Sequence, residues 1–387
     1  MHKYLLLLAV TGCGPTYTYL GDADGGVSTT NEILPVAVFA PAVDARDGES
    51  HSMVVADFNK DAKLDIFASG EATAGLLGKG DGTFTATNGM LGASTWLAAG
   101  DINGDSKTDL VTVGTIGVKT MLSYLGNADG SFQAPTQFDA TQPVIVELGD
   151  FSGDGLADLA VANRKFSGAG SLAIFVSGQS AQLQETDTSD SPGALLVLDL
   201  NGDGKPDVLM AGGDASQSQG WVNTFFGRGD GHMDSGKLYS SLVDGVAGLG
   251  TGDFDGDGKL DVVAVTAHGL LLFGHGDGMG GFTFGPSFGG ETASAQDAVI
   301  NIGVGDFNHD QKLDVVILVR PDSGTPYLNV IPGDGKGLFG IPQHLADIGT
   351  NLQTGGHPLG IGDFNGDGKP DIAIAHAKVD ILLNQSP

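Results

Sequence analysis

Seven nine-residue segments of this 387-residue chain place acidic, amide or hydroxyl oxygens at alternate positions. Each follows the pattern Asp-x-(Asn/Asp/Ser)-x-Asp-x-x-x-Asp and is followed by an apolar run. Oxygens at positions 1, 3 and 5 of a tight turn converge on one point, as in the first half of an EF-hand loop. A backbone carbonyl near position 7 and the Asp at position 9 would complete a shell of hard oxygen ligands. The pattern therefore predicts up to seven Ca²⁺ sites.

The predicted ligands are the residues at positions 1, 3, 5 and 9 of the seven copies. They are Asp57, Asn59, Asp61, Asp65, Asp101, Asn103, Asp105, Asp109, Asp150, Ser152, Asp154, Asp158, Asp199, Asn201, Asp203, Asp207, Asp253, Asp255, Asp257, Asp261, Asp306, Asn308, Asp310, Asp314, Asp363, Asn365, Asp367 and Asp371. A single copy could equally be a surface turn whose polar side chains bond their own backbone. Seven copies in register argue against that alternative.

The copies differ at position 6, where we expect left-handed backbone. Copies 3, 4, 5 and 7 have Gly there, whereas the others have Ala62, Ser106 and Gln311. A non-glycine residue in that conformation carries strain of about 1 kcal/mol. Ser152 is also a neutral, weaker ligand in copy 3. We expect copies 5, 4 and 7 to bind most tightly and copy 1 least.

With these loops the chain resembles the FG-GAP/VCBS repeat family, which includes integrin α-subunit heads and bacterial surface proteins. The resemblance covers roughly residues 33–387, and its Phe-Gly…Pro part is degenerate, as in Phe132 to Pro135 and Phe339 to Pro342. It implies a β-propeller with the calcium loop between the first and second strands of each blade. It also implies ligand binding on the face opposite these loops.

The order of apolar runs leads to the same fold class. The copies start 44 to 57 residues apart, and 64 glycines are spread evenly between short β-like runs. Each unit has an apolar run before its loop and two after it, then a Gly-Asp-Gly-type hairpin and an outer strand. The seventh unit ends after its third run, Val379 to Leu383. The sequence predicts an all-β, seven-bladed β-propeller whose N-terminal strand completes the last blade.

We place that closing strand at Val36 to Val43. Phe39 precedes Asp57 by 18 residues, as Phe132 precedes Asp150 by 18. Donation of this strand to the seventh blade would remove an open sheet edge. The predicted propeller domain therefore spans residues 33–387.

The N-terminus resembles a bacterial lipoprotein signal. A short basic start and the apolar run Leu5 to Val10 precede Val10-Thr11-Gly12-Cys13, and Cys13 is the single cysteine. We expect a signal peptide over residues 1–12, acylation of Cys13 and a flexible tether over residues 13–32. The protein would be exported and lipid-anchored to the bacterial outer membrane or cell surface. An ordinary secretory signal and a misassigned start remain alternatives.

The charge balance bears on partners. The formal net charge of -29 opposes binding to nucleic acid, and no basic patch with interleaved aromatics is present. Of the 47 acidic residues, 22 occupy loop positions, and seven bound Ca²⁺ ions would reduce the net charge to -15. The acidity thus indicates a metal requirement first. Contact with a membrane is expected only through the lipid anchor.

Other motifs fit turns better than catalysis. Arg228-Gly229-Asp230 spells an integrin-recognition tripeptide, but it occupies the expected third-to-fourth-strand hairpin. Gly285 to Gly289 matches a nucleophile elbow without the helix which that motif requires. We expect no enzymatic activity and favour adhesion or protein binding, to an unknown surface protein or glycan. A calcium-supported lectin and an enzyme with its site on the propeller face are the alternatives. Trp96 and Trp221 would serve a ligand face or pack between blades.

Overall fold

The computed structural model describes residues 43–47, 52–114, 120–165, 168–178, 182–188, 190–214, 219–242, 244–285, 298–348, 358–376 and 378–387. The predicted signal peptide, Cys13 and the tether over residues 13–32 lie outside the described residues. The described segments contain strands and turns, and among them no helix has the length and apolar character needed to cross a membrane.

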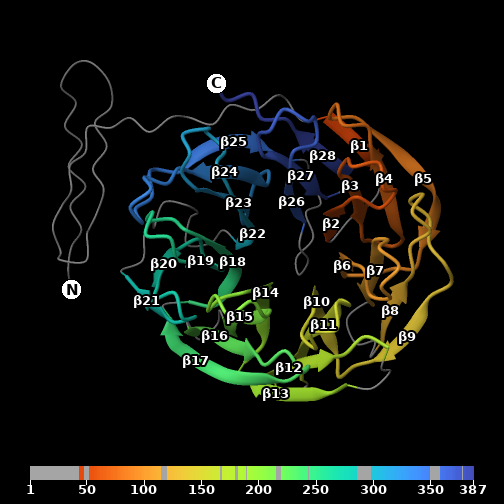
Figure 1. The fold of residues 1–387 in the computed structure, drawn as a ribbon. Helices are drawn as coiled ribbons and strands as arrows, with labels where there is room; N and C mark the ends of the chain where they lie inside the picture. The colour runs from red at the N-terminus through yellow and green to blue at the C-terminus, as the bar shows by residue number, and fades with distance from the viewer. Residues whose placement is uncertain are drawn as a thin grey trace.

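The strands of the described chain form seven four-stranded antiparallel sheets, arranged as blades around a central axis (Figure 1). The first, innermost strands are β2 (Met53–Ala56), β6 (Trp96–Gly100), β10 (Pro143–Gly149), β14 (Pro192–Leu198), β18 (Val246–Gly252), β22 (Ala298–Gly305) and β26 (Leu359–Gly362). The second strands are β3 (Asp65–Ala68), β7 (Asp109–Val113), β11 (Asp158–Arg164), β15 (Asp207–Asp214), β19 (Asp261–Thr266), β23 (Asp314–Arg320) and β27 (Asp371–Ala375).

The third strands are β4 (Thr73–Gly78), β8 (Thr120–Tyr124), β12 (Gly170–Phe175), β16 (Gln219–Gly227), β20 (Leu271–Gly276), β24 (Tyr327–Ile331) and β28 (Lys378–Leu382). The outer strands are β5 (Phe84–Leu91), β9 (Thr136–Asp139), β13 (Gln184–Thr188), β17 (Met233–Leu242), β21 (Phe282–Phe284), β25 (Gln343–Asp347) and β1 (Val43–Asp47). This arrangement confirms the predicted all-β, seven-bladed β-propeller.

Burial follows strand position within a blade. Second and third strands such as β12 and β19 are buried along their whole length, because neighbouring blades cover both faces of each sheet. Outer strands are more exposed: three of the four residues of β9 are exposed, and β13 alternates exposed with less exposed residues. The innermost strands of successive blades contact one another, and β26 contacts β2 to close the ring. The hydrophobic core is therefore distributed between the blades.

An N-terminal strand completes the last blade, as predicted, but its bounds differ from those we expected. β1 pairs antiparallel with β28, with Val43 opposite Ile381 and Asp47 opposite Lys378. Residues 36–42 lie outside the described residues. β1 continues to Asp47, four residues beyond the predicted end at Val43.

Candidate metal-binding loops

All seven Asp-rich loops lie on one face of the propeller. Each second strand begins at the position-9 Asp, so each loop connects the first strand of a blade to the second. The hairpins between third and fourth strands reach the same face, where the amide of Gly82 donates to the carbonyl of Phe364 at 2.9 Å. The position-2 side chains anchor the loops between blades: six are buried, with Phe151 and Phe307 at 0% exposure, and Ile102 is partly buried.

Within a loop, the carboxylates at positions 1 and 5 and the oxygen at position 3 accept backbone N–H groups. In copy 4, Asp199 accepts from Gly202 at 2.8 Å, from Asp203 at 3.1 Å and from Gly204 at 2.8 Å. Asn201 Oδ1 also accepts from the Asp203 amide, at 2.9 Å. Asp203 in turn accepts from the Lys205 amide at 3.0 Å. Because positions 1 and 3 share one donor, their oxygens lie close together without a metal ion.

The position-9 carboxylate joins three strands of its blade. Asp207 is fully buried, and it accepts the Leu200 amide at 2.9 Å through Oδ2 and the Gly227 amide at 2.8 Å through Oδ1. The same pair of bonds recurs with small changes in all seven copies. Burial raises the pKa of the Asp207 carboxyl, and its two backbone donors oppose that rise. This residue therefore has a structural role whether or not it also binds a metal.

A lysine at position 7 lies beside the position-5 carboxylate in five copies. The ammonium–carboxylate pairs are Lys63 with Asp61, Lys107 with Asp105, Lys205 with Asp203, Lys259 with Asp257, and Lys312 with Asp310, at 2.7 to 3.7 Å. The hydrogen bond from Lys259 lowers the pKa of the Asp257 carboxyl. These lysines supply positive charge where a cation would bind. The sequence pattern contained them, but the prediction from it gave them no role.

Copy 5 has the densest set of carboxylates. One carboxylate oxygen each from Asp253, Asp255 and Asp257 lie within 4.8 Å of one another. Asp255, Asp261 and the imidazole of His275 form a second group of the same size. His275 Nδ1 is 2.8 Å from Asp255 Oδ2. The structure thus places the four predicted ligands of this copy in two groups that share Asp255, and the second group includes a nitrogen donor that the loop pattern does not contain.

Copy 6 is the most enclosed loop. Asn308 is buried, and burial raises the pKa of the Asp314 carboxyl to about 7. The C-terminal segment covers this loop, because Asn384 Nδ2 and Ser386 Oγ both donate to the Phe307 carbonyl, at 2.9 and 2.8 Å. In other loops the equivalent position-2 carbonyl accepts a hydrogen bond from the hairpin of the next blade. One example is the Gly337 amide, which donates to the Phe254 carbonyl. The C-terminal segment therefore replaces the hairpin that blade 7 lacks.

Backbone geometry confirms that position 6 is left-handed. The φ angles are 63° at Ala62, 60° at Ser106 and 67° at Gln311. Position 4 is left-handed as well, with Lys60 and His309 both at 62°. The prediction missed position 4, although Gly at this position in the other five copies was a readable signal. Copies 1 and 6 thus hold two non-glycine residues in this conformation.

The structure also places the two tryptophans, the Arg228–Asp230 tripeptide and Ser152, which the sequence analysis singled out. Trp221 is 2% exposed and packs in the core between blades, whereas Trp96 is 6% exposed, packs in the same core and also lines the central channel. Arg228 and Asp230 lie in the hairpin between β16 and β17, where Asp230 accepts the His232 amide at 3.0 Å. In copy 3 the buried Oγ of Ser152 has no hydrogen-bond partner among the described residues.

These features define a propeller of repeated blades, each with an oxygen-rich loop of the type that binds hard cations. A family model described as FG-GAP-like repeat matches residues 57–112, 199–264, 253–317 and 306–374, together more than half of the chain. The chain belongs to this FG-GAP-like repeat family.

Comparison with solved structures supports the fold. The crystal structure of BBS1N in complex with ARL6DN has a TM-score of 0.59 and 10% sequence identity. The match covers 91% of this chain and 98% of that chain. At this identity the likeness concerns the fold alone. No curated protein matches the chain by sequence.

Proposed function

We propose that this protein is a calcium-stabilised propeller that serves as a non-enzymatic scaffold for binding another protein at the bacterial cell surface. FG-GAP-like repeats in a seven-bladed propeller fit a protein-binding scaffold. The adhesive role, the calcium ions and the lipid anchor at Cys13 are parts of the proposal.

The observation that carries the calcium proposal is the convergence of oxygens in copy 5. Three carboxylates whose oxygens lie within 4.8 Å repel one another, and a divalent cation would remove that repulsion. The donors are hard oxygens, which suits Ca²⁺. The ligands in each copy would be the residues at positions 1, 3, 5 and 9. Extracellular calcium modules commonly bind with Kd of about 10⁻⁴ to 10⁻³ M, which fits permanent occupancy outside a cell.

Calcium binding can be tested by isothermal titration of the chelator-treated protein. The proposal expects a stoichiometry near seven for the wild type. The double variant Asp257→Asn/Asp261→Asn should lose one site, and the charge-matched control Asp322→Asn/Asp347→Asn should lose none. A stoichiometry of zero in the wild type would contradict the proposal.

Two features support a protein partner on the face opposite the loops. The second strands end there in residues such as Arg164 and Arg320, away from the Asp-rich loops. BBS1N was crystallised in complex with ARL6DN, which gives one example of a propeller with this fold in complex with another protein. Arg164 is exposed, and its Nε donates to Ser191 Oγ at 2.6 Å. Lys165 pairs with Asp187 beside it.

A pull-down of surface proteins with the full chain as bait tests the binding face. Arg164→Ala/Lys165→Ala should reduce capture of the partner at least about tenfold, the effect of losing a contact of about 1.4 kcal/mol. Lys79→Ala/Lys336→Ala removes the same charge from exposed hairpins on the loop face and should leave capture unchanged. Chelation should abolish capture if calcium maintains the ring. Equal losses from the two double variants would place the partner elsewhere.

The anchor has its own test. In the source cell, Cys13→Ala should move the protein from the membrane fraction to the soluble exported fraction. Cys13→Ser offers a second variant with the same expectation and nearly unchanged volume. Retention of both variants in the membrane fraction would contradict lipidation at this residue.

A further inference from the structure

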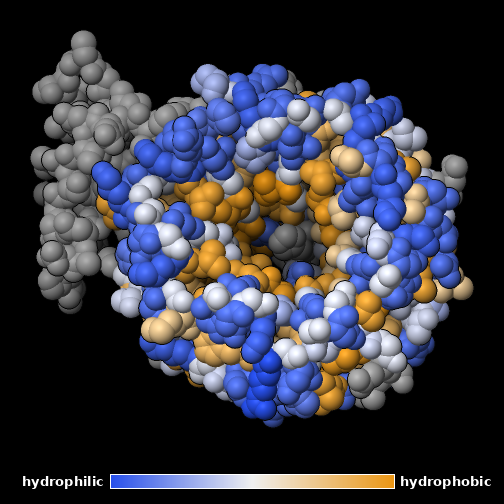
Figure 2. Space-filling view, viewed as in Figure 1, coloured by the Kyte–Doolittle hydropathy of each residue, from blue (hydrophilic) through white to orange (hydrophobic). Residues whose placement is uncertain are grey.

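The innermost strands of the seven blades enclose a channel with a cavity volume of about 400 Å³. Figure 2 shows its hollow mouth with mostly hydrophobic walls. Side chains such as Met53, Leu249, Ile302 and Leu359 line it. Glu147 is the only charged side chain among the described residues that line this channel.

Glu147 breaks the pattern that the seven repeats share. It lies on β10, three residues before the first Asp of its loop. The residues at the same place in the other blades are Val54, Ala98, Leu196, Gly250, Gly303 and Gly360, and all of them line the channel. Six blades thus place hydrocarbon or no side chain at this position, and blade 3 places a carboxylate there.

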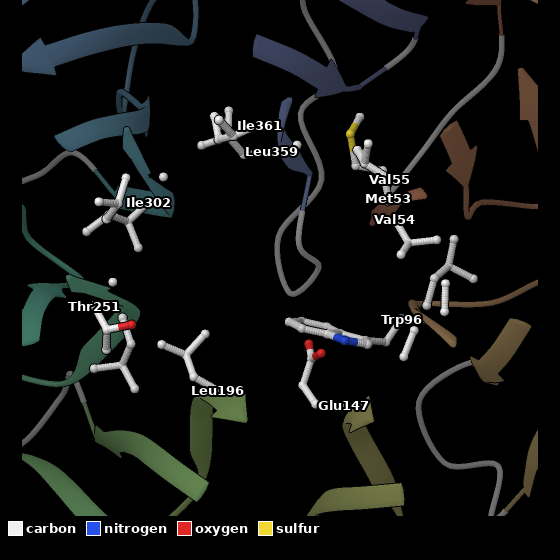
Figure 3. Close-up of a pocket in the computed structure, with 18 residues that line it drawn as sticks. Met53, Val54, Val55, Trp96, Glu147, Leu196, Thr251, Ile302, Leu359 and Ile361 are labelled. Atoms are coloured by element: carbon white, nitrogen blue, oxygen red, sulfur yellow. The ribbon is translucent and has the colours of Figure 1, made fainter. Parts of the chain in front are cut away.

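The surroundings of Glu147 isolate its charge. Its side chain is partly exposed to the channel, and desolvation by the surrounding channel wall raises its pKa to about 8. The Trp96 side chain donates a hydrogen bond to it, which opposes part of that rise. Figure 3 shows the Trp96 ring system extending into the channel against the carboxyl group, with Thr251 on the far wall. A lone carboxylate in such surroundings is unfavourable unless a proton or a cation neutralises it.

We propose that this channel is a binding site for a small organic cation with an apolar body, of the alkylammonium class. The ammonium group pairs with the Glu147 carboxylate and lies beside the Trp96 ring, whose face attracts cations. The hydrocarbon body lies along the apolar walls and removes their surface from water. The site is separate from the loops and does not depend on the proposed partner-binding face.

The donor set argues for an organic cation over other ligands. A metal ion such as Ca²⁺ requires six to eight oxygens, and one carboxylate with a single Thr hydroxyl on the far wall does not provide them. An anion would find no positive side chain among the described lining residues and would be repelled by Glu147 once its carboxyl ionises. A neutral apolar molecule would leave the carboxylate unpaired, so it would gain nothing from the feature that distinguishes this blade.

Isothermal titration of the full chain with hexylammonium chloride, in calcium-containing buffer, tests the proposal. The wild type should bind at one site, and Glu147→Gln should bind at least about tenfold more weakly. Glu71→Gln removes an exposed glutamate from a turn in blade 1 and should bind like the wild type. 1-Hexanol should bind both proteins with equal affinity. Absence of saturable hexylammonium binding to the wild type, or equal affinity for Glu147→Gln, overturns the proposal.

Proton release gives a second, independent readout. With a pKa near 8, Glu147 is about 90% protonated at pH 7 and about 10% protonated at pH 9. Hexylammonium keeps its own proton at both pH values. Binding should therefore release about 0.9 proton at pH 7 and about 0.1 at pH 9, and affinity should rise about tenfold between them. Titrations in buffers of different ionisation enthalpy measure this release. Binding without proton release at pH 7 contradicts the proposal even if Glu147→Gln fails to fold.

Discussion

Carboxylates occupy two contrasting regions of this propeller, the loops on one face and the central channel. In the loops each carboxylate is surrounded by backbone N–H donors, and Asp199 alone accepts three of them. In the channel Glu147 has the Trp96 side chain as donor and hydrocarbon around it. A lysine lowers the pKa of the Asp257 carboxyl, whereas enclosure raises that of Glu147.

This difference shows that the surrounding donors, more than the residue type, decide what an acidic side chain can do. The loop carboxylates at positions 1 and 5 are oriented by N–H donors, so they suit a hard cation that takes several oxygens, although burial raises the pKa of position-9 carboxyls such as that of Asp314. The channel carboxylate is held close to neutrality at pH 7, so it suits a ligand that brings one positive charge and an apolar body. The two regions therefore differ in their response to calcium, to pH and to substitution.

Removal of calcium should produce the largest change. An ion present at about 100 times its Kd contributes about 2.7 kcal/mol for each site that only the folded state offers. With several loops occupied, the melting temperature in about 10 mM CaCl₂ should exceed that in EGTA by at least about 10 °C. The same concentration of MgCl₂ controls for ionic strength. Equal melting temperatures in CaCl₂ and EGTA would mean that the N–H donors alone satisfy the loop carboxylates.

The pH dependence of the free energy of unfolding measures the contribution of Glu147 in the channel. In the unfolded chain Glu147 releases its proton near its ordinary pKa of 4.5, whereas in the folded protein it keeps it until about pH 8. Its contribution to folding stability is therefore lost as the pH rises from 4.5 to 8, by up to about 5 kcal/mol. Denaturant unfolding at pH 5 and at pH 8.5 should show Glu147→Gln gaining stability relative to the wild type only at the higher pH. A difference that does not change with pH would place Glu147 in a water-like environment.

Two carboxylates of copy 5 separate structural from metal-binding roles. Asp261 is buried and accepts the Phe254 and Gly276 amides at 3.0 and 2.8 Å, whereas Asp257 lies in the exposed part of the loop. In EGTA, Asp261→Asn should lower the free energy of unfolding by about 3 kcal/mol, because an amide cannot accept both bonds. Asp257→Asn should leave it nearly unchanged.

In calcium, each of these two variants should lose one bound ion, measured by titration. Together the stability and titration results distinguish Asp261, which joins strands, from Asp257, which would serve only to bind the ion. If both variants destabilise the metal-free protein equally, the position-9 carboxylate has no separate structural role.

Much of the fold could be predicted because its signals are local. The loop pattern, the apolar runs beside it and the unpaired third strand of the seventh unit are each readable within a few dozen residues. The predicted closing strand ended at Val43, whereas β1 continues to Asp47, because the polar stretch after Val43 carries no apolar signal. The left-handed residues Lys60 and His309 were missed because only position 6 was compared between copies.

The channel site could not be predicted in the same way. Its wall collects one to four residues from each of seven strands that are far apart in sequence. The run Pro143 to Gly149 shows that Glu147 interrupts an apolar strand, but alternation alone does not tell whether it faces the axis or the next blade. Its contact with Trp96 depends on the packing of β6 against β10. Comparing the seven copies three residues before each loop would have singled out Glu147, although not its partner.

The smallest expected effect concerns differences among the loops themselves. Ala62 has φ of 63°, whereas Gly258, its counterpart in copy 5, has φ of 81° and open space where a Cβ would lie. Left-handed backbone costs a non-glycine residue about 1–2 kcal/mol, and the entropy of glycine in the unfolded chain offsets about half of that. In EGTA, Ala62→Gly should therefore stabilise the protein by about 0.5–1 kcal/mol, and Gly258→Ala should destabilise it by a similar amount. Denaturant unfolding of both variants measures this. Neither change alters a predicted ligand. Opposite shifts in the free energy of unfolding would show that backbone conformation makes the metal-free loop of copy 5 more stable than that of copy 1. Shifts of the same sign would contradict this.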